Sequence, residues 1–523
     1  MRKFLENHGL KPHKITVLSS VTFVTFQNDE DRNEALIKLK DVFWKKQKLV
    51  VRIAKAKEDP LAAAKETQNK EPLTREEFEI QLKDSVIPFW RLNYNPDQLQ
   101  LKKDKVLQTL ANIRVQTLKS NTLLAPLIDS VTAVDSSAKP LVCPCADIVP
   151  SPVLDHYRNK CEFTVGADYN GNEPKIGFRL GKYKAGKLTV GLPESIQIVP
   201  QNTLNIVNKL QQLFDAEIGD SNGRLAFTRA YNPRDNAGHW RMVLVRQTLS
   251  NETLVLVDLC PKDLSEDKLT LIRQILKCWL ESNPQLNVTS FFFNLRVNSA
   301  DPLNPELLSG QPQITEICCG LQFKISPNSF FQVNTKATEL LYDQIKSSAL
   351  DLVDNCDRGK VVLLDVCCGT GTIGLCLAKY FDKVIGIELI PEAVEDALEN
   401  AKFNQINNAD FFAGKAEDLV QNVIRTVPST HKVVAVLDPP RCGVHSSVIN
   451  TLRKCQAVKG IVFVSCDISA ASQNFVTLSQ LPSNKIGGDP FYPVMAQPFD
   501  LFPQTNHVEV VISYRRVPQQ LLE

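Results

Sequence analysis

Residues 361–378 read VVLLDVCCGTGTIGLCLA, and this stretch decides the fold. An apolar run leads to Asp365 and then into a Gly-Thr-Gly turn, after which Gly374 opens an apolar helical pattern. Short apolar runs predict buried strands, and glycines in a turn let the backbone come close to a ligand. The stretch therefore predicts a strand, a ligand-binding turn and a helix N-terminus with unpaired N–H groups.

A second acidic residue closes the next predicted strand. Val384 to Ile387 form an apolar run that ends in Glu388. A carboxylate about twenty residues beyond a glycine-rich turn commonly binds the hydroxyls of a ligand ribose. The glycines nearly fit the dinucleotide fingerprint, so a nicotinamide enzyme stays open, as does a purely structural turn. Asp365, ahead of the turn, favours an enzyme that uses S-adenosylmethionine.

Length and composition limit the class of protein. The 523 residues predict about three domains with full cores, and a net charge of +2 neither requires nor excludes RNA. No apolar run reaches membrane-spanning length and no secretory signal precedes the first domain, so no membrane partner is expected. The fourteen scattered cysteines are typical of reduced thiols in the cytosol or the nucleus. A monomer is expected.

Pairs of neighbouring cysteines raise the question of a metal site. Cys143 and Cys145 are separated by one residue, whereas Cys318-Cys319 and Cys367-Cys368 are adjacent. None of these pairs has the two-residue spacing of zinc or iron–sulfur sites. We interpret them as packing residues, and no metal is predicted.

The first of four predicted segments, residues 1–58, reads as a small α/β module with its beginning missing. Strands are expected at 20–26 and 49–54, and a helix at 29–40. Phe23 and Phe26 lie on the first strand, whose sequence resembles the second half of the RNA-recognition-motif signature, in which aromatic side chains stack on bases. The usual Lys/Arg-Gly opening is absent. Base stacking and packing therefore both stay open.

Residues 59–140 are predicted to be a linker and helical segment, and residues 141–325 a central α+β domain that binds RNA. Residues 59–85 read as a charged linker, 98–113 as an amphipathic helix and 120–150 as a loop. In the central domain strands are expected at 162–167, 176–180, 225–229, 240–246, 253–259 and 290–296, and helices at 201–214 and 266–281.

The start of the central domain has a basic bias. Its positive side chains are Arg158, Lys160, Arg179, Lys182, Lys184 and Lys187. We expect a phosphate-contacting face here, although solvated strand edges also use lysine.

The last segment, residues 326–523, gathers polar side chains at the ends of predicted strands. Asp438 follows the run Val433 to Leu437, Cys466 follows Ile461 to Val464, and Glu509 leads into a final strand expected at 510–512. The carboxyl edge of a parallel sheet is where open α/β folds bind ligands. A thiol and a carboxylate at that edge suit methylation at carbon-5 of uracil. Thiolate addition to carbon-6 makes carbon-5 nucleophilic, and a base later removes its proton.

Six motifs carry a family resemblance: FFQVN, DVCCGTGTIG, GIE, DPPR, VSCD and HVE occur in the order seen in the tRNA (uracil-5-)-methyltransferases. The resemblance covers about residues 85–515 and implies a doubly wound α/β domain, S-adenosylmethionine as cofactor and 5-methylation of the T-loop uridine, position 54, of tRNA. It implies Cys466 as nucleophile and Glu509 as proton acceptor. The implied cofactor contacts are Gln332, Asp365, Cys367, Gly369, Gly371, Thr372, Glu388 and Asp438.

The resemblance leaves several points open. Asp438 is implied either to contact the cofactor or to orient the uracil, and Cys442 competes with Cys466 as nucleophile. Tyr157, Arg158 and Lys160 resemble a substrate-side motif of the family. Cytosine-5 methylation, a dehydrogenase and a non-catalytic RNA chaperone remain alternatives. The target uridine is expected to leave its stack at a cost of a few kcal/mol, and other structured RNA stays open as a partner.

Overall fold

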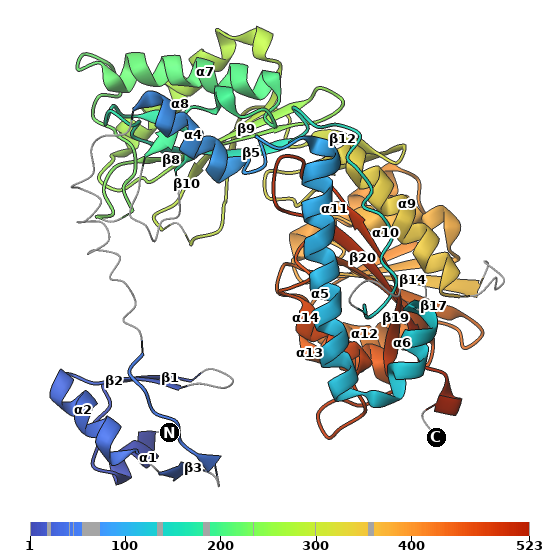
Figure 1. Ribbon diagram of the computed structural model, residues 1–523. Coiled ribbons are helices and arrows are strands. Elements are labelled where there is room, and N and C mark those ends of the chain that lie inside the picture. Colours follow the sequence, from blue (N-terminus) through green and yellow to red (C-terminus); the bar gives the residue numbers. More distant parts are fainter. Residues whose placement is uncertain are drawn as a thin grey trace. The chain divides into compact units, whose positions relative to one another are not determined.

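The computed structural model describes residues 2–17, 22–40, 42–44, 47–54, 74–132, 140–180, 189–233, 235–298, 300–353 and 360–521. The chain divides into two compact units (Figure 1). The first comprises residues 1–72 with 183–186, and the second comprises residues 73–182 with 187–523.

The first unit is a small α/β module. Its elements are α1 (Arg2–Asn7), β1 (Lys14–Val17), β2 (Thr22–Thr25), α2 (Asp29–Lys38), β3 (Phe43–Trp44) and β4 (Gln47–Lys48). Leu5, Leu10, Ala35 and Leu39 form its core. The prediction of a strand at 49–54 was wrong, because β4 ends at Lys48 and residues 49–54 form no strand.

The two aromatic side chains predicted to stack on bases lie differently in this unit. Phe23 is 46% exposed, whereas Phe26 packs against the small core. Only Phe23 is therefore placed to offer a face to a base, and for Phe26 the packing alternative holds. The likeness of this unit to an RNA-recognition motif stays a prediction.

A seven-stranded sheet forms the centre of the second unit's first half. Its strand order is β11-β10-β9-β8-β5-β6-β7. The strands are β5 (Lys160–Gly166), β6 (Lys175–Arg179), β7 (Val190–Gly191), β8 (Trp240–Gln247), β9 (Thr253–Leu259), β10 (Val288–Leu295) and β11 (Glu306–Gly310). α7 (Gln201–Phe214) and α8 (Glu266–Glu281) lie on one face (Figure 1) and confirm both predicted helices.

Alternation along the strands explains why both faces of this sheet are covered. Val243 and Val255 belong to the core shared with α7 and α8, whereas the adjacent Leu244 and Leu254 belong to a different core. That second core also contains the hairpin of β12 (Ile314–Cys318) and β13 (Leu321–Ile325) together with α9 (Thr335–Asp351). Successive side chains of a strand point to opposite faces, so the sheet joins two cores.

Three predictions for the region between residues 74 and 233 were wrong. Residues assigned to a linker form α4 (Arg75–Val86), which a reciprocal capping box between Thr74 and Glu77 starts. The predicted loop at 120–150 contains α6 (Ala125–Thr132), which follows α5 (Leu99–Ser120). The strand predicted at 225–229 is a turn, because its apolar side chains are buried locally without a partner strand.

The second half of this unit contains a sheet of seven strands in the order β16-β15-β14-β17-β18-β20-β19. The strands are β14 (Val361–Val366), β15 (Lys383–Glu388), β16 (Ala409–Ala413), β17 (Lys432–Leu437), β18 (Val458–Ser465), β19 (Phe491–Phe499) and β20 (Glu509–Arg516). The strands from β16 to β18 run parallel, and β20 is antiparallel to both its neighbours. The chain winds outward from β14 and then returns to β17 on its other side, which confirms the doubly wound fold.

Helices cover both faces of this sheet (Figure 1). α9, α10 (Thr372–Leu377) and α11 (Pro391–Phe403) share one core with the sheet. α5, α12 (Ala416–Arg425), α13 (Ser446–Lys454) and α14 (Ser472–Ser479) share the other. Within the described ranges, no helix combines the length and apolarity needed to cross a bilayer.

Candidate active site

The glycine-rich turn leaves β14 in a left-handed backbone conformation. Cys367, Gly369 and Gly371 have φ values of +64°, +55° and +77°. A Cβ on Gly371 would lie 2.8 Å from atoms of the Phe411 ring, so only glycine fits there. Cys367 tolerates this backbone as an uncommon non-glycine residue, and its N–H donates to the Ile387 carbonyl at 2.9 Å. The turn is thereby tied to the end of β15.

Asp365 is the buried carboxylate beneath this turn. Its Oδ2 accepts the N–H of Gly374 at 2.9 Å, whereas its buried Oδ1 has no hydrogen-bond partner. Burial raises the pKa of Asp365 to about 7, and the charges of Asp438 and Glu388 add to the rise. Buried acceptors are nearly always paired, so the free Oδ1 marks a position for a donor from a ligand.

Glu388 joins the turn to the strand next to it. One carboxylate oxygen accepts the N–H of Gly369 at 3.0 Å. The other accepts the N–H groups of Leu389 and Ile390 at 2.7 Å and 3.1 Å. The structure thus brings Asp365, the turn and Glu388 to the same edge of the sheet, as the sequence predicts.

Sequence reasoning missed Tyr342 as a member of this site. Its hydroxyl and the Thr372 Oγ1 lie 2.9 Å apart, and burial raises its pKa well above the usual value. Tyr342 comes from α9, which packs against α10 on the same face of the sheet. Its only signal in the sequence is a place on the apolar side of that helix, which does not distinguish a site residue from core.

Gln332 lies just before α9 and is 8% exposed. Its main-chain carbonyl accepts a hydrogen bond from the side-chain amide of Asn159 at 2.9 Å. The same amide also donates to Thr335 Oγ1 at 3.0 Å. Asn159 belongs to the central domain and Thr335 begins α9. These bonds therefore fix the start of α9 against the central sheet.

Cys466 and Glu509 lie at the end of an antiparallel strand pair. The register of β18 and β20 pairs Ser465 with Val510, so the next positions along it are Cys466 and Glu509. Burial, together with the Glu509 carboxylate, raises the pKa of Cys466 to about 11, and the Arg441 guanidinium opposes the rise. Burial also raises the pKa of Glu509 well above its usual value.

Asp438 is the fourth acidic group at this edge. It follows β17, which lies between β14 and β18, so it stands between the turn and the thiol. Burial raises its pKa to about 7. Its charge contributes to the raised pKa of Asp365, of Cys466 and of Glu509. The structure therefore gathers the predicted carboxylates and thiol around one position.

The loop after Asp438 is fixed by Asn474. The Asn474 side chain accepts the N–H of Val444 at 2.8 Å and donates to its carbonyl at 2.9 Å. A Cβ on Gly443 would lie 1.9 Å from Asn474 Oδ1, so the loop requires glycine there. Cys442 is exposed on this loop, whereas Cys466 is half-buried beside Glu509.

Of the residues predicted to contact RNA in the central domain, Tyr157 is buried in the structure. It is 8% exposed, and its hydroxyl donates to the Pro503 carbonyl at 3.0 Å. Its contact with RNA stays a prediction. Lys160 pairs with Glu162 at 3.1 Å. Arg158 is half-buried, and its N–H donates to the Ile198 carbonyl. Lys182, Lys184 and Lys187 lie outside the described residues.

Comparison with solved structures agrees with this fold. The Pyrococcus abyssi tRNA (uracil-54, C5)-methyltransferase, solved in complex with S-adenosyl-L-homocysteine, superposes with a TM-score of 0.51. The two are 19% identical, and the match covers 76% of this chain and 85% of the other. Strand order, turn and acidic edge together define a class I methyltransferase fold.

Sequence comparison gives the family. The family described as tRNA (Uracil-5-)-methyltransferase matches residues 318–517. The mouse tRNA (uracil-5-)-methyltransferase homolog A is 38% identical over 99% of this chain and 82% of its own length. The human homolog B is 33% identical over 84% of each chain. The chain belongs to the tRNA (uracil-5-)-methyltransferase family.

Proposed function

We propose that this protein transfers a methyl group to carbon-5 of a uridine in tRNA, at position 54 of the T loop. The observation that carries the proposal is the placement of Cys466 next to Glu509 at the edge that also holds the glycine-rich turn. Membership of the family and the fold support it.

The turn fits S-adenosylmethionine, which supplies an electrophilic methyl group when bound. Asp365 offers an unpaired buried oxygen, and Glu388 lies where ribose hydroxyls are commonly held, next to the N–H of Gly369. Thr372, the first residue of α10, and Gln332, just before α9, are further proposed contacts. These residues would hold the cofactor.

Cys466 would act as the nucleophile. Its sulfur bonds to carbon-6 of the uracil, and the ring becomes an enolate whose carbon-5 accepts the methyl group. A thiol with a pKa of about 11 is mostly protonated at neutral pH, so its ionisation must be assisted. Arg441 lowers the pKa of Cys466 and is positioned to favour the thiolate.

Glu509 would remove the proton from carbon-5 after methylation. The electron pair of that C–H bond re-forms the double bond between carbon-5 and carbon-6, and the thiolate leaves. Because burial raises the pKa of Glu509, its carboxylate is a stronger base than an exposed one once it has lost its own proton. Asp438 would orient the uracil or contact the cofactor from the neighbouring strand.

The experiment that tests this proposal uses tRNA in which uridine is replaced by 5-fluorouridine. Fluorine cannot leave as a proton, so we expect a stable covalent adduct in the presence of the methyl donor. Cys466→Ala is expected to abolish the adduct, whereas the exposed Cys442→Ala is expected to keep it. Loss of the adduct only in Cys442→Ala would contradict the assignment of the nucleophile.

The same assay tests the site of methylation. A tRNA with cytidine in place of the T-loop uridine is expected to form neither product nor adduct. Methylation of that cytidine would favour the cytosine-5 alternative. Binding of tRNA without turnover by the intact protein would favour a chaperone without catalysis.

A further inference from the structure

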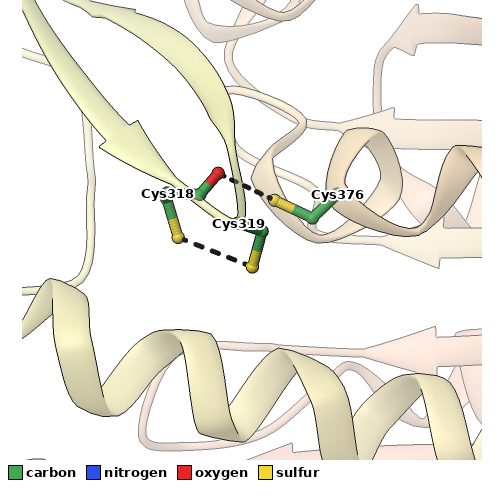
Figure 2. Close-up of side chains that lie close together, drawn as sticks. All are labelled: Cys318, Cys319 and Cys376. Atoms are coloured by element: carbon green, nitrogen blue, oxygen red, sulfur yellow. Dashed lines mark hydrogen bonds between the residues drawn. The ribbon is translucent and has the colours of Figure 1, made fainter.

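Three cysteines from two separate elements meet behind the glycine-rich turn. Cys318 ends β12, Cys319 begins the following turn, and Cys376 lies on α10 (Figure 2). Their Sγ atoms all lie within 4.8 Å of one another, and those of Cys318 and Cys319 are 4.0 Å apart. Cys318 and Cys376 are buried, and Cys319 is half-buried. We call these residues the thiol cluster.

An unusual backbone conformation brings the two adjacent thiols together. Cys319 has a φ of +51° and Gly320 a φ of +78°, between the paired residues Cys318 and Leu321. A two-residue hairpin turn of this kind favours Asn, Asp or Gly at its first position. A non-glycine residue in this left-handed region is strained, and such strain gathers at functional sites. Figure 2 shows the Cys318 and Cys319 side chains directed to the same side.

Weak hydrogen bonds already join the three residues. The Cys318 thiol donates to the Cys319 sulfur, and the two Sγ atoms are 4.0 Å apart. The Cys376 thiol donates to the Cys318 carbonyl at 3.9 Å. Thiolates, and not thiols, are the ligands of soft metal ions.

Space beside the cluster provides access. A cavity of about 250 Å³ is lined by Cys319, Cys376 and Lys379. The Glu339 carboxylate accepts a hydrogen bond from the main-chain N–H of Cys319 at 3.0 Å. A cation entering through this cavity would thus meet sulfur ligands, and water could fill a fourth position.

We propose that Cys318, Cys319 and Cys376 bind one thiophilic closed-shell cation, Zn²⁺ or Cu⁺. Metal–sulfur bonds of about 2.3 Å place the sulfurs of such a site roughly 4 Å apart, so the observed separations need only a small inward shift. Binding releases the thiol protons and changes no oxidation state. The bound ion would fasten the β12–β13 hairpin to α10, one turn beyond Thr372.

This inference reverses the expectation that the cysteines only pack. Cys376 follows Cys318 by 58 residues, and only the fold brings it close to the adjacent pair Cys318 and Cys319. The site takes no part in methyl transfer, so it stands or falls independently of the proposed function.

The test measures metal bound to the reduced full-length protein after loading with Zn²⁺ and, separately and without oxygen, with Cu⁺. We expect one equivalent of at least one ion and a rise in unfolding temperature. Cys319→Asn is the variant to compare, because Asn-Gly is the preferred sequence for this turn and the substitution removes one ligand while keeping the hairpin. It is expected to lose the bound ion and the temperature rise. Matched controls are Cys278→Ser, at an exposed thiol, and Cys466→Ala, and both are expected to keep the equivalent.

Two results would overturn the proposal. One is equal metal content in the wild type and in Cys319→Asn. The other is absence of bound metal in the wild type together with the loss of two hydrogens from the cluster under a mild oxidant, measured by mass spectrometry. The second result would make these residues a disulfide-forming pair in place of a metal site.

Discussion

Lys102 and Asp500 form an ion pair of 2.6 Å in which neither side chain is exposed. Lys102 also donates to the Phe502 carbonyl at 3.0 Å, and the Asp500 carboxylate accepts the N–H of Phe502. The pair connects α5 to the segment between β19 and β20. Since β20 begins at Glu509, this contact holds the approach to the active site in place.

Removing one partner of this pair is expected to be costly. Lys102→Met would leave Asp500 buried and unpaired, and we expect a loss of about 3–5 kcal/mol in the free energy of unfolding. Chemical denaturation measures it. Lys103→Met is the matched control, because Lys103 pairs with an exposed Asp147 and its loss should leave stability nearly unchanged. Equal effects of the two substitutions would contradict the assigned role of the buried pair.

The reactivity of Cys466 is expected to depend steeply on pH. Because its pKa is raised to about 11, the thiolate fraction, and with it the rate of alkylation, should rise roughly tenfold per pH unit from pH 7 to pH 10. Peptide mapping after timed treatment with iodoacetamide measures this rate. A rate at Cys466 that levels off below pH 9 would show that its pKa is not raised.

Glu509→Gln separates the nucleophile from the base. Without the carboxylate the proton at carbon-5 has no acceptor, so we expect turnover to fall by about 10²–10⁴-fold while the covalent adduct accumulates on ordinary tRNA. The substitution also removes a charge that raises the pKa of Cys466, so alkylation at alkaline pH should be faster. Glu392→Gln, an exposed position on α11, serves as the control. Full activity of Glu509→Gln would rule this base out.

Two glycines of the turn provide a matched pair. Gly369 and Gly371 both have positive φ, but only at Gly371 would a Cβ meet the Phe411 ring. Gly371→Ala is expected to destabilise by about 1–3 kcal/mol more than Gly369→Ala and to weaken cofactor binding more strongly. Thermal unfolding and calorimetry with S-adenosylhomocysteine compare the two. Indistinguishable variants would mean that contact with Phe411 does not shape the turn.

The local periodicity of apolar residues in the sequence predicted most of the fold. α7 and α8 begin and end where their patterns predict, and each strand predicted in the doubly wound domain is present. The sites at strand ends followed from topology, because parallel strands bring their carboxyl ends to one edge. For α4 the sequence did hold a signal: Thr74 and Glu77 have the spacing of a capping box, and the surrounding charge concealed it.

Other features depend on contacts between distant segments, which periodicity does not encode. Leu225 is fully buried but belongs to no strand, so the apolar residues at 225–229 led to the wrong prediction of a strand. The hydrogen bond between the Tyr157 hydroxyl and the Pro503 carbonyl joins residues that are far apart in the sequence. Tyr342 and Cys376 gained their neighbours only through the packing of α9, α10 and the β12–β13 hairpin.

The position of β20 sets the order in which the protein becomes competent during synthesis. Among the described strands it leaves the ribosome last, yet it lies inside the sheet between β18 and β19. A nascent chain that has released Cys466 still lacks Glu509. The thiol proposed to attack the uridine and the carboxylate proposed to remove its proton therefore come together only after β20 has joined β18 in the sheet.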